Sequence, residues 1–324
     1  MMVSLTTSTW LRLDAFLAAL ALWLLLCPRW IPQPPSVQRS LWIKLGVFAL
    51  VVHATLALIG LGGPWLKVAM AAVAAVSSRE LTLVLLPPGR EQRPYRWLAV
   101  GGSVAIASVA GPAGAELQAL VAVLLAAASL PVFLRRPAGA CASAGAVALT
   151  SLLAGLLPAY VIRLRAEHAG YAAFLFLLVA LNDAGAEAVG RTFGRRPFFT
   201  RLSPRKTVEG FLGGLLASAA VAIAFAPLLD DDGVRPAAFA IVAALTAVLG
   251  DLVFSAIKRD VGCKDFRALL PAHGGLLDRF DSFLVSAACC YVLLAAVPLV
   301  SAATGSHFTP WPPAMGAGPW QVPP

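Results

Sequence analysis

Five aspartates and five basic residues crowd into the short segment that runs from Asp251 to Asp281. A solvated connector has no need of so many carboxylates, and this one follows a long apolar stretch. Carboxylates beside fixed cations suit a site that holds a divalent metal ion and a polyphosphate together. The segment therefore predicts phosphoryl or nucleotidyl transfer at the edge of a membrane. The charged residues concerned are Asp251, Lys258, Arg259, Asp260, Lys264, Asp265, Arg267, Asp278, Arg279 and Asp281.

Helical spacing would bring several of these groups together. Asp251, Ser255 and Lys258 recur at i, i+4 and i+7, so one helix face carries a carboxylate, a hydroxyl and an ammonium. Asp278 and Asp281 are three residues apart, and like charges so close raise each other's proton affinity. A bound Mg²⁺ removes that conflict and also bridges phosphate oxygens. For Asp278 and Asp281 the alternative of a salt-bridged helix start at the membrane interface stays open.

A second polar segment lies upstream, between 182 and 210. Asp183 and Glu187 stand in an apolar run, and the loop 190–207 that follows holds six basic residues. Positive charge for topology or for anionic lipid explains part of this loop. It does not explain a turn, a cation, a hydroxyl and an acid gathered at a helix start, in the order Ser203-Pro204-x-Lys206-Thr207-x-Glu209-Gly210.

Simpler roles remain open in this second segment. Ser203 can cap the turn before Pro204, and Glu209 can complement the dipole of the following helix. Gly210 and Gly214 form a small-xxx-small pair, which favours helix packing over catalysis.

Composition indicates which elements must position these residues. Hydrophobic residues make up 59% of the chain and charged residues 13%, against roughly 45–50% and 25% in soluble domains. We therefore expect an all-α, polytopic integral membrane protein with about ten transmembrane helices. The expected spans are 11–27, 41–62, 65–86, 96–112, 115–134, 139–162, 170–189, 208–228, 236–257 and 279–302.

The net charge of +9 does not indicate a nucleic-acid partner, because its distribution fits a membrane topology. With the N-terminus outside, 19 of the 25 basic residues fall in inside loops. This asymmetry follows the positive-inside rule and places both charged segments in the cytoplasm. Glu80 lies inside the third span, where burying a charge costs free energy, so we expect its side chain to face a polar interior. A structural and a functional role for Glu80 both stay open. The five cysteines lack metal-ligand or disulfide spacing.

These motifs together resemble the phosphatidate cytidylyltransferase family, also called CDP-diacylglycerol synthases. The resemblance covers residues 180–283 well, and upstream only hydropathy and Glu80 fit. It rests on four motifs: Gly190-Arg191-x-Phe193-Gly194-Arg195, Ser203-Pro204-x-Lys206-Thr207-x-Glu209-Gly210, Ser255-x-Ile257-Lys258-Arg259-x-x-x-x-Lys264-Asp265, and Leu270-Pro271-x-His273-Gly274-Gly275-Leu276-x-Asp278-Arg279-Phe280-Asp281.

The resemblance implies transfer of CMP from CTP to phosphatidic acid, with release of pyrophosphate, in phospholipid biosynthesis. It implies Mg²⁺ as cofactor, with a second, monovalent ion as an option, in a bacterial plasma membrane with the site facing the cytoplasm. A homodimer is compatible with the sequence, which does not determine the oligomeric state. The implied metal ligands are Asp183, Asp251, Asp278 and Asp281. The implied catalytic residues are three of these, Asp251, Asp278 and Asp281, together with Lys258, Arg259, Asp265 and His273. The implied nucleotide contacts are Arg191, Ser203, Lys206, Thr207, Gly274 and Gly275.

The expected organisation has N-terminal transmembrane helices in 1–170, a catalytic membrane region in 171–304 and an irregular Pro-rich tail in 305–324. Glu187, Arg267 and Ala272 depart from the family's usual residues but leave the implied ligands in place. Three alternatives stay open: a CTP- or ATP-dependent polyprenol or lipid kinase, a catalytically weak paralogue, and a membrane scaffold or transporter that retains the motifs.

Overall fold

The computed structural model describes two compact units that interleave along the chain. Unit 1 comprises Met1–Leu66 and Gly170–Lys264, and unit 2 comprises Lys67–Ala169 and Asp265–Pro324. Each unit thus joins an earlier stretch of sequence to a later one. The described residues are 7–30, 35–111, 114–198, 202–203, 206–225, 229, 234–266 and 275–304. The predicted tail, 305–324, lies outside them, as do His273 and Gly274.

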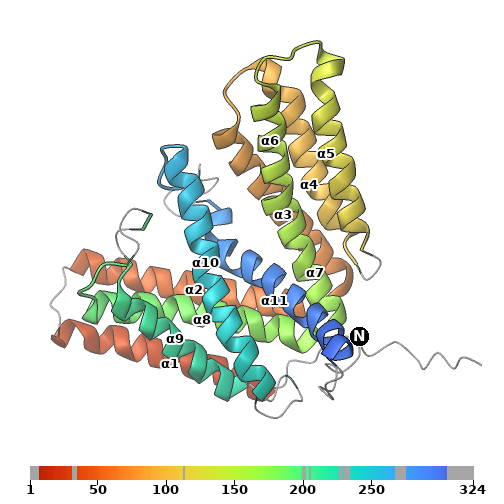
Figure 1. Ribbon diagram of the computed structural model, residues 1–324. Coiled ribbons are helices and arrows are strands. Elements are labelled where there is room, and N and C mark those ends of the chain that lie inside the picture. The colour runs from red at the N-terminus through yellow and green to blue at the C-terminus, as the bar shows by residue number, and fades with distance from the viewer. Residues whose placement is uncertain are drawn as a thin grey trace, which may run out of the picture. The chain divides into compact units, whose positions relative to one another are not determined.

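Unit 1 is built from five long helices, which Figure 1 labels. They are α1 (Thr7–Trp30), α2 (Pro35–Leu61), α8 (Ala169–Phe193), α9 (Val208–Phe225) and α10 (Val234–Asp260). Helix α1 packs on α2 and α9, and α9 packs on α10. Aromatic rings join α8 to α10, because Tyr171 meets the edge of Phe239 at a centroid distance of 4.9 Å. The core of unit 1 therefore lies around α8.

Glycines set the close approach of α8 and α9. A Cβ atom on Gly213 would lie 2.4 Å from Cβ of Val189, and one on Gly185 would lie 2.5 Å from Cβ of Ala217. A Cβ on Gly214 would lie 2.8 Å from Oδ1 of Asn182. Larger residues at these positions would push the helices apart, so the glycines let backbone pack on backbone. The packing role expected for Gly214 is confirmed.

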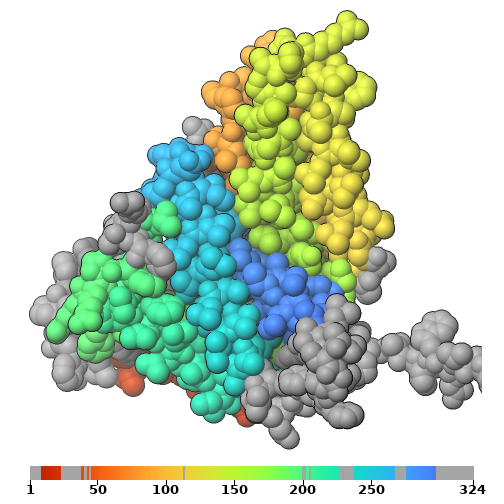
Figure 2. All heavy atoms as spheres, viewed as in Figure 1, coloured from red at the N-terminus to blue at the C-terminus, as the bar shows by residue number. Residues whose placement is uncertain are grey.

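Unit 2 contains the remaining helices. They are α3 (Gly63–Leu85, which begins in unit 1), η1 (Arg90–Gln92), α4 (Arg93–Val109), α5 (Ala115–Leu134), α6 (Ala140–Thr150), η2 (Ser151–Leu156), α7 (Leu157–Glu167) and α11 (Leu277–Thr304). Helices α6, η2 and α7 form one rod, whose middle part η2 is π-helical. Helix α4 packs on α5 and α6, and α7 packs on α11. Helix α5 leaves Leu125, Val132 and Phe133 exposed along its uncovered side (Figure 2), as suits a face against lipid.

The described residues form helices and no strand, with one isolated bridge between Pro197 and Thr207. Seven helical segments are long and apolar enough to cross a membrane. The chain is therefore an all-α, polytopic membrane protein, as predicted. Of the ten expected spans, the other three are represented by α1, α2 and α4, and the count of ten stays a prediction. The seven are Gly63–Leu85, Ala115–Leu134, Ala140–Glu167, Ala169–Phe193, Val208–Phe225, Ala237–Asp260 and Leu277–Ala296.

Candidate functional site

The charged cluster of unit 1 forms where α8, α10 and the loop before α9 come together. The ammonium of Lys206 pairs with Oδ2 of Asp251, which stands on α10. Asp183, on α8, interacts electrostatically with both, and its carboxylate accepts a hydrogen bond of 3.3 Å from Nδ2 of Asn182. The side chains of Lys206 and Asp251 are 32% and 28% exposed, so a ligand can reach them. Two carboxylates and one cation on a long, flexible side chain therefore lie together in unit 1.

A short turn holds Lys206 in place. The Lys206 N–H donates to the carbonyl of Ser203 at 3.1 Å, and the Phe198 N–H donates to the carbonyl of Lys206 at 2.7 Å. The Val208 N–H donates to the carbonyl of Arg196 at 2.9 Å, beside the bridge that links the two sides. The capping role expected of the Ser203 side chain stays a prediction, since the bond to Lys206 uses the Ser203 carbonyl. The turn fixes the Lys206 backbone and leaves the long side chain free to reach either a carboxylate or a phosphate.

Thr207 and Glu209 build the start of α9. Oγ1 of Thr207 accepts a 3.1 Å hydrogen bond from the Gly210 N–H and so caps the helix. Oε2 of Glu209 accepts from the N–H groups of Arg195 and Arg196, at 3.0 and 3.1 Å. Glu209 thus organises the preceding loop, a role beyond the dipole interaction expected for it. Both residues shape the loop that carries Lys206.

Two basic residues of the predicted site, Arg191 and Arg259, already have partners within unit 1. Nε of Arg191 donates to the carboxylate of Glu187, one helical turn earlier, at 2.9 Å. The Arg259 guanidinium donates to the carbonyls of Leu202 at 3.3 Å and Cys263 at 3.2 Å. Arg259 thereby ties the end of α10 to the turn that precedes Lys206, so the two charged segments noticed in the sequence meet here.

Helix α10 presents the predicted polar face. It runs from Val234 to Asp260 and so contains Asp251, Ser255 and Lys258 at the expected helical spacing. Ser255 and Lys258 are buried, each 8% exposed. Polar groups buried at the end of an apolar helix indicate a site rather than a solvated surface.

The remaining predicted residues that the structure describes lie in unit 2. Oδ2 of Asp278, in the first turn of α11, accepts hydrogen bonds from the N–H groups of Phe266 and Gly275, both at 3.1 Å. Oδ1 of Asp281 accepts from the Ser282 N–H at 2.7 Å. Asp265 is exposed. The structure thus places Asp278 where it joins the two ends of the segment 267–274, a function that the spacing of the carboxylates did not indicate.

Glu80 confirms the structural hydrogen-bonding role that the sequence left open. Its side chain on α3 is fully buried. Oε1 accepts from the Leu276 N–H at 2.8 Å, and Oε2 accepts from the Leu277 N–H at 3.0 Å. An unpaired intramembrane charge is costly, and these two backbone donors offset that cost.

The donor set of unit 1 fits the Mg²⁺ ion that the resemblance implies. Mg²⁺ is usually held by one or two carboxylates, while waters and substrate phosphates supply its other ligands. Asp183 and Asp251 supply two such carboxylates, and Oδ2 of Asp251, which is shielded from solvent, is paired only with the Lys206 ammonium among the described residues. Among those residues, no three His, Cys, Asp or Glu side chains form a metal-binding group. Joint use of Asp278 and Asp281 for the same ion therefore stays a prediction.

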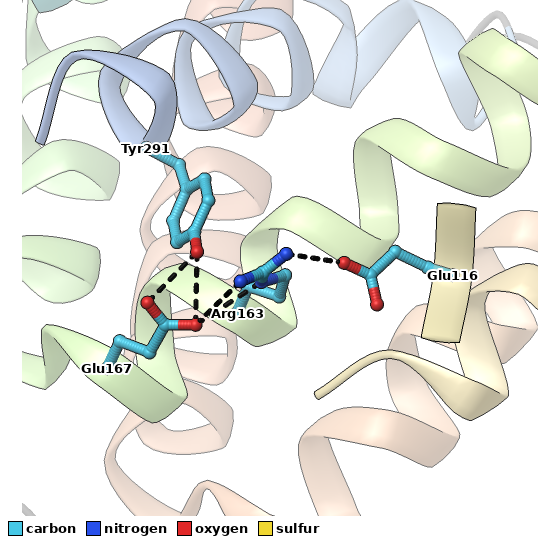
Figure 3. A network of polar contacts seen from close by, with 4 residues as sticks. All are labelled: Glu116, Arg163, Glu167 and Tyr291. Carbon is cyan, nitrogen blue, oxygen red and sulfur yellow. Dashed lines mark hydrogen bonds and ion pairs between the residues drawn. The ribbon is translucent and has the colours of Figure 1, made fainter. Parts of the chain in front are cut away.

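A second polar cluster, which the sequence reasoning missed, lies inside unit 2 (Figure 3). Arg163 of α7 pairs with Glu116 of α5 at 2.8 Å and with Glu167 at 3.1 Å. The Tyr291 hydroxyl of α11 contacts both oxygens of Glu167, at 3.0 and 2.9 Å, and the guanidinium lies 4.7 Å from the Tyr291 ring centroid. The sequence offered one signal for this cluster: Glu116 stands at the start of one apolar run, and Arg163 and Glu167 stand at the end of another. The cluster joins α5, α7 and α11.

A histidine with a lowered pKa lies next to this cluster in the sequence. His168 lies between the spans that end at Glu167 and begin at Ala169. Burial lowers the pKa of its imidazole below the ordinary value, and the neighbouring Glu167 only partly opposes the shift.

Apolar spanning helices with carboxylates and cations gathered at their ends define a polytopic membrane protein with a charged, ligand-accessible site. Comparison with known proteins narrows the class. The chain belongs to the cytidylyltransferase family, which it matches over residues 42–297.

Individual relatives agree with this assignment. The chain is similar to the phosphatidate cytidylyltransferase of Mycobacterium leprae (strain TN), with 42% identity over 135 residues, which are 41% of this chain and 43% of that protein. The protein of the same name from Staphylococcus saprophyticus is 42% identical over 127 residues, 39% of this chain and 49% of the relative. The one from Mycobacterium tuberculosis (strain H37Rv) is 40% identical over 132 residues, 40% of each. The alignments thus span less than half the length of these relatives.

Proposed function

We propose that the chain is a phosphatidate cytidylyltransferase, which transfers CMP from CTP to phosphatidic acid and releases pyrophosphate. Family membership and the names of the relatives support this substrate pair. The structural observation that carries the proposal is the pairing of Lys206 with Asp251 beside Asp183. Two carboxylates on apolar helices and a cation in the neighbouring loop suit a nucleotide that meets a lipid headgroup.

In the proposed reaction, a phosphate oxygen of phosphatidic acid bonds to the α-phosphorus of CTP. The bond from that phosphorus to the oxygen that leads to the β-phosphate breaks, and pyrophosphate leaves with the bonding electrons. The attacking oxygen is already anionic, so no side chain has to remove a proton. Positioning and neutralisation of charge then supply the catalysis.

The residues of unit 1 divide this work. Asp183 and Asp251 would hold Mg²⁺, which would neutralise phosphate charge when bound. The Lys206 ammonium exchanges its carboxylate partner for a phosphate oxygen, and Arg191 and Lys258 add positive charge along the polyphosphate. Arg259 keeps the turn before Lys206 against α10.

We place the reaction at the cytoplasmic face of a bacterial plasma membrane. The positive-inside distribution of 19 of the 25 basic residues supports this orientation. The bacterial origin of the relatives supports the choice of membrane.

The test is an assay of the purified protein in detergent with Mg²⁺, phosphatidic acid and CTP. One batch of CTP is labelled in cytidine and another in the γ-phosphate. We expect pyrophosphate and cytidine-labelled lipid in equal amounts, and neither product when Mg²⁺ or phosphatidic acid is left out. A parallel reaction with diacylglycerol in place of phosphatidic acid should give no labelled lipid. Entry of the γ-phosphate into lipid would identify a kinase and contradict the proposal, as would a failure to consume CTP.

A further inference from the structure

Glu80 is a fully buried carboxylate that the proposed chemistry does not use. It stands on α3, and both of its oxygens accept backbone hydrogen bonds at the start of α11, from Leu276 at 2.8 Å and Leu277 at 3.0 Å. The first N–H groups of a helix have no partner within the helix. A capping side chain normally comes from a neighbouring residue, whereas this one is 196 positions away from Leu276. The contact therefore ties α3 to the beginning of α11.

The same region holds the two ends of the segment 267–274. Oδ2 of Asp278 accepts from Phe266 on one side of the segment and from Gly275 on the other. Glu80 then holds Leu276 and Leu277, the residues between Gly275 and Asp278. Two carboxylates thus fasten one stretch of backbone, Asp278 from within α11 and Glu80 from α3.

Gly275 is shaped for this contact. A Cβ atom at this position would lie 2.8 Å from Oε2 of Glu80 and 3.1 Å from Cβ of Phe266. The first distance is too short for a real contact, so a larger residue would displace the Glu80 carboxylate or the backbone. Gly275 and Glu80 therefore form one fitted pair.

We infer that Glu80 is a positioning residue for the proposed reaction: it holds the backbone of Leu276 and Leu277, at the start of α11, in one arrangement, and through it orients Asp278. Its effect on catalysis rests on the proposed function. Its effect on the backbone does not, and can be measured without substrate.

The first measurement is amide hydrogen exchange of residues 275–278 in detergent without nucleotide. In the variant Glu80→Gln, one oxygen becomes an NH₂ group that faces a backbone donor, so one hydrogen bond is lost. We expect the Leu276 or Leu277 amide to exchange about tenfold faster or more. Ser77→Ala is the matched control, because Ser77 is buried on the same helix and its hydroxyl has no partner among the described residues. Its exchange should equal that of the parent protein.

The second measurement separates positioning from simple stabilisation. In Glu80→Gln we expect the Mg²⁺ concentration for half-maximal pyrophosphate release to rise about tenfold, because Asp278, which the resemblance implies as a further metal ligand, loses its orientation. Gly275→Ala should produce the same two changes, and the double variant should add little, since both substitutions break one contact.

Unchanged exchange in Glu80→Gln and in Gly275→Ala would overturn the inference. Faster exchange with an unchanged Mg²⁺ requirement would also overturn it, because Glu80 would then only stabilise the fold. If the parent protein makes no CDP-lipid, the proposed function fails, whereas the exchange result still decides whether Glu80 holds this backbone. Should Glu80→Gln not fold, Gly275→Ala supplies both measurements.

Discussion

At the scale of single residues, carboxylates that look alike in the sequence have different partners. Asp251 pairs with the side chain of Lys206, and a side-chain cation can leave when a ligand arrives. Oδ2 of Asp278 accepts two backbone N–H groups, which can leave only if the chain itself moves. Asp251 is therefore suited to exchange partners during a reaction, and Asp278 to hold its surroundings still.

The substitution Asp251→Asn should abolish turnover while protein levels stay near normal. It removes one negative charge with little change in shape, so the cluster loses an Mg²⁺ ligand and the partner of Lys206. We expect pyrophosphate release to fall at least about 100-fold, the size of effect that follows loss of one key electrostatic group. Asp260→Asn is the control, since Asp260 is exposed on the same helix. A wild-type rate in Asp251→Asn would refute the metal assignment.

Lys206→Ala should raise the CTP requirement. A hydrogen bond to a charged group contributes roughly 1.5–3 kcal/mol, so the KM for CTP should increase about tenfold or more. Steady-state kinetics at saturating phosphatidic acid measure this. Arg196→Ala removes a cation from the same loop but keeps the backbone hydrogen bond to Glu209, and its KM should not change. An unaltered KM in Lys206→Ala would remove this residue from the nucleotide site.

At the scale of elements, the cluster around Arg163 holds three helices of unit 2 together. Glu116 is fully buried and the Arg163 side chain is 16% exposed, so neither charge is compensated by water. Tyr291 extends the cluster to α11. Helix α11 is also held at its start by Glu80. Its position in unit 2 therefore depends on two sets of polar contacts, one at its first turn and one at Tyr291.

Arg163→Met should destabilise the protein by about 3 kcal/mol, because it leaves the buried Glu116 carboxylate without a counter-charge. The control is Arg136→Met. Arg136 pairs with Glu91, but their side chains are 64% and 66% exposed, and an exposed pair contributes less than about 1 kcal/mol. Unfolding in mixed detergent, followed by circular dichroism, compares the two variants. Equal stability of the two would mean that the cluster in Figure 3 does not stabilise unit 2.

At the scale of the whole molecule, the membrane determines where the site can act. The spanning helices are apolar and contain few charged residues, and most of the basic residues lie in every second loop between them. This alternation requires the loop after α10 and the loop before it to lie on opposite sides of the membrane.

Thiol labelling can test this topology. Cys263 follows α10, and the predicted outside loop before α10 contains Asp231. In variants that keep only Cys263 or only the thiol of Asp231→Cys, we expect a charged, membrane-impermeant maleimide to label Cys263 in inside-out vesicles alone. The thiol of Asp231→Cys should react in intact spheroplasts alone. The opposite pattern would reverse the topology and place the site away from cytoplasmic CTP.

Much of the fold follows from the sequence, because local rules govern it. Apolar runs of about 20 residues must be helical in a bilayer, where backbone groups bond within their own segment. The expected spans 41–62, 65–86 and 115–134 therefore match α2, α3 and α5 within a few residues, apart from the earlier start of α2. The shared helix of Asp251, Ser255 and Lys258 follows from the same local geometry.

The contacts that give the polar residues their roles were decided only by the tertiary structure. Nothing in the spacing of Glu80 indicates Leu276 and Leu277, and nothing near Glu116 or Arg163 indicates Tyr291. Likewise, Lys206 and Asp251 had separate predicted tasks before the structure paired them. Helical periodicity concerns neighbours along one segment, whereas these pairs depend on which helices pack together. Side-chain chemistry therefore revealed which groups were available, and packing within each unit decided which of them meet.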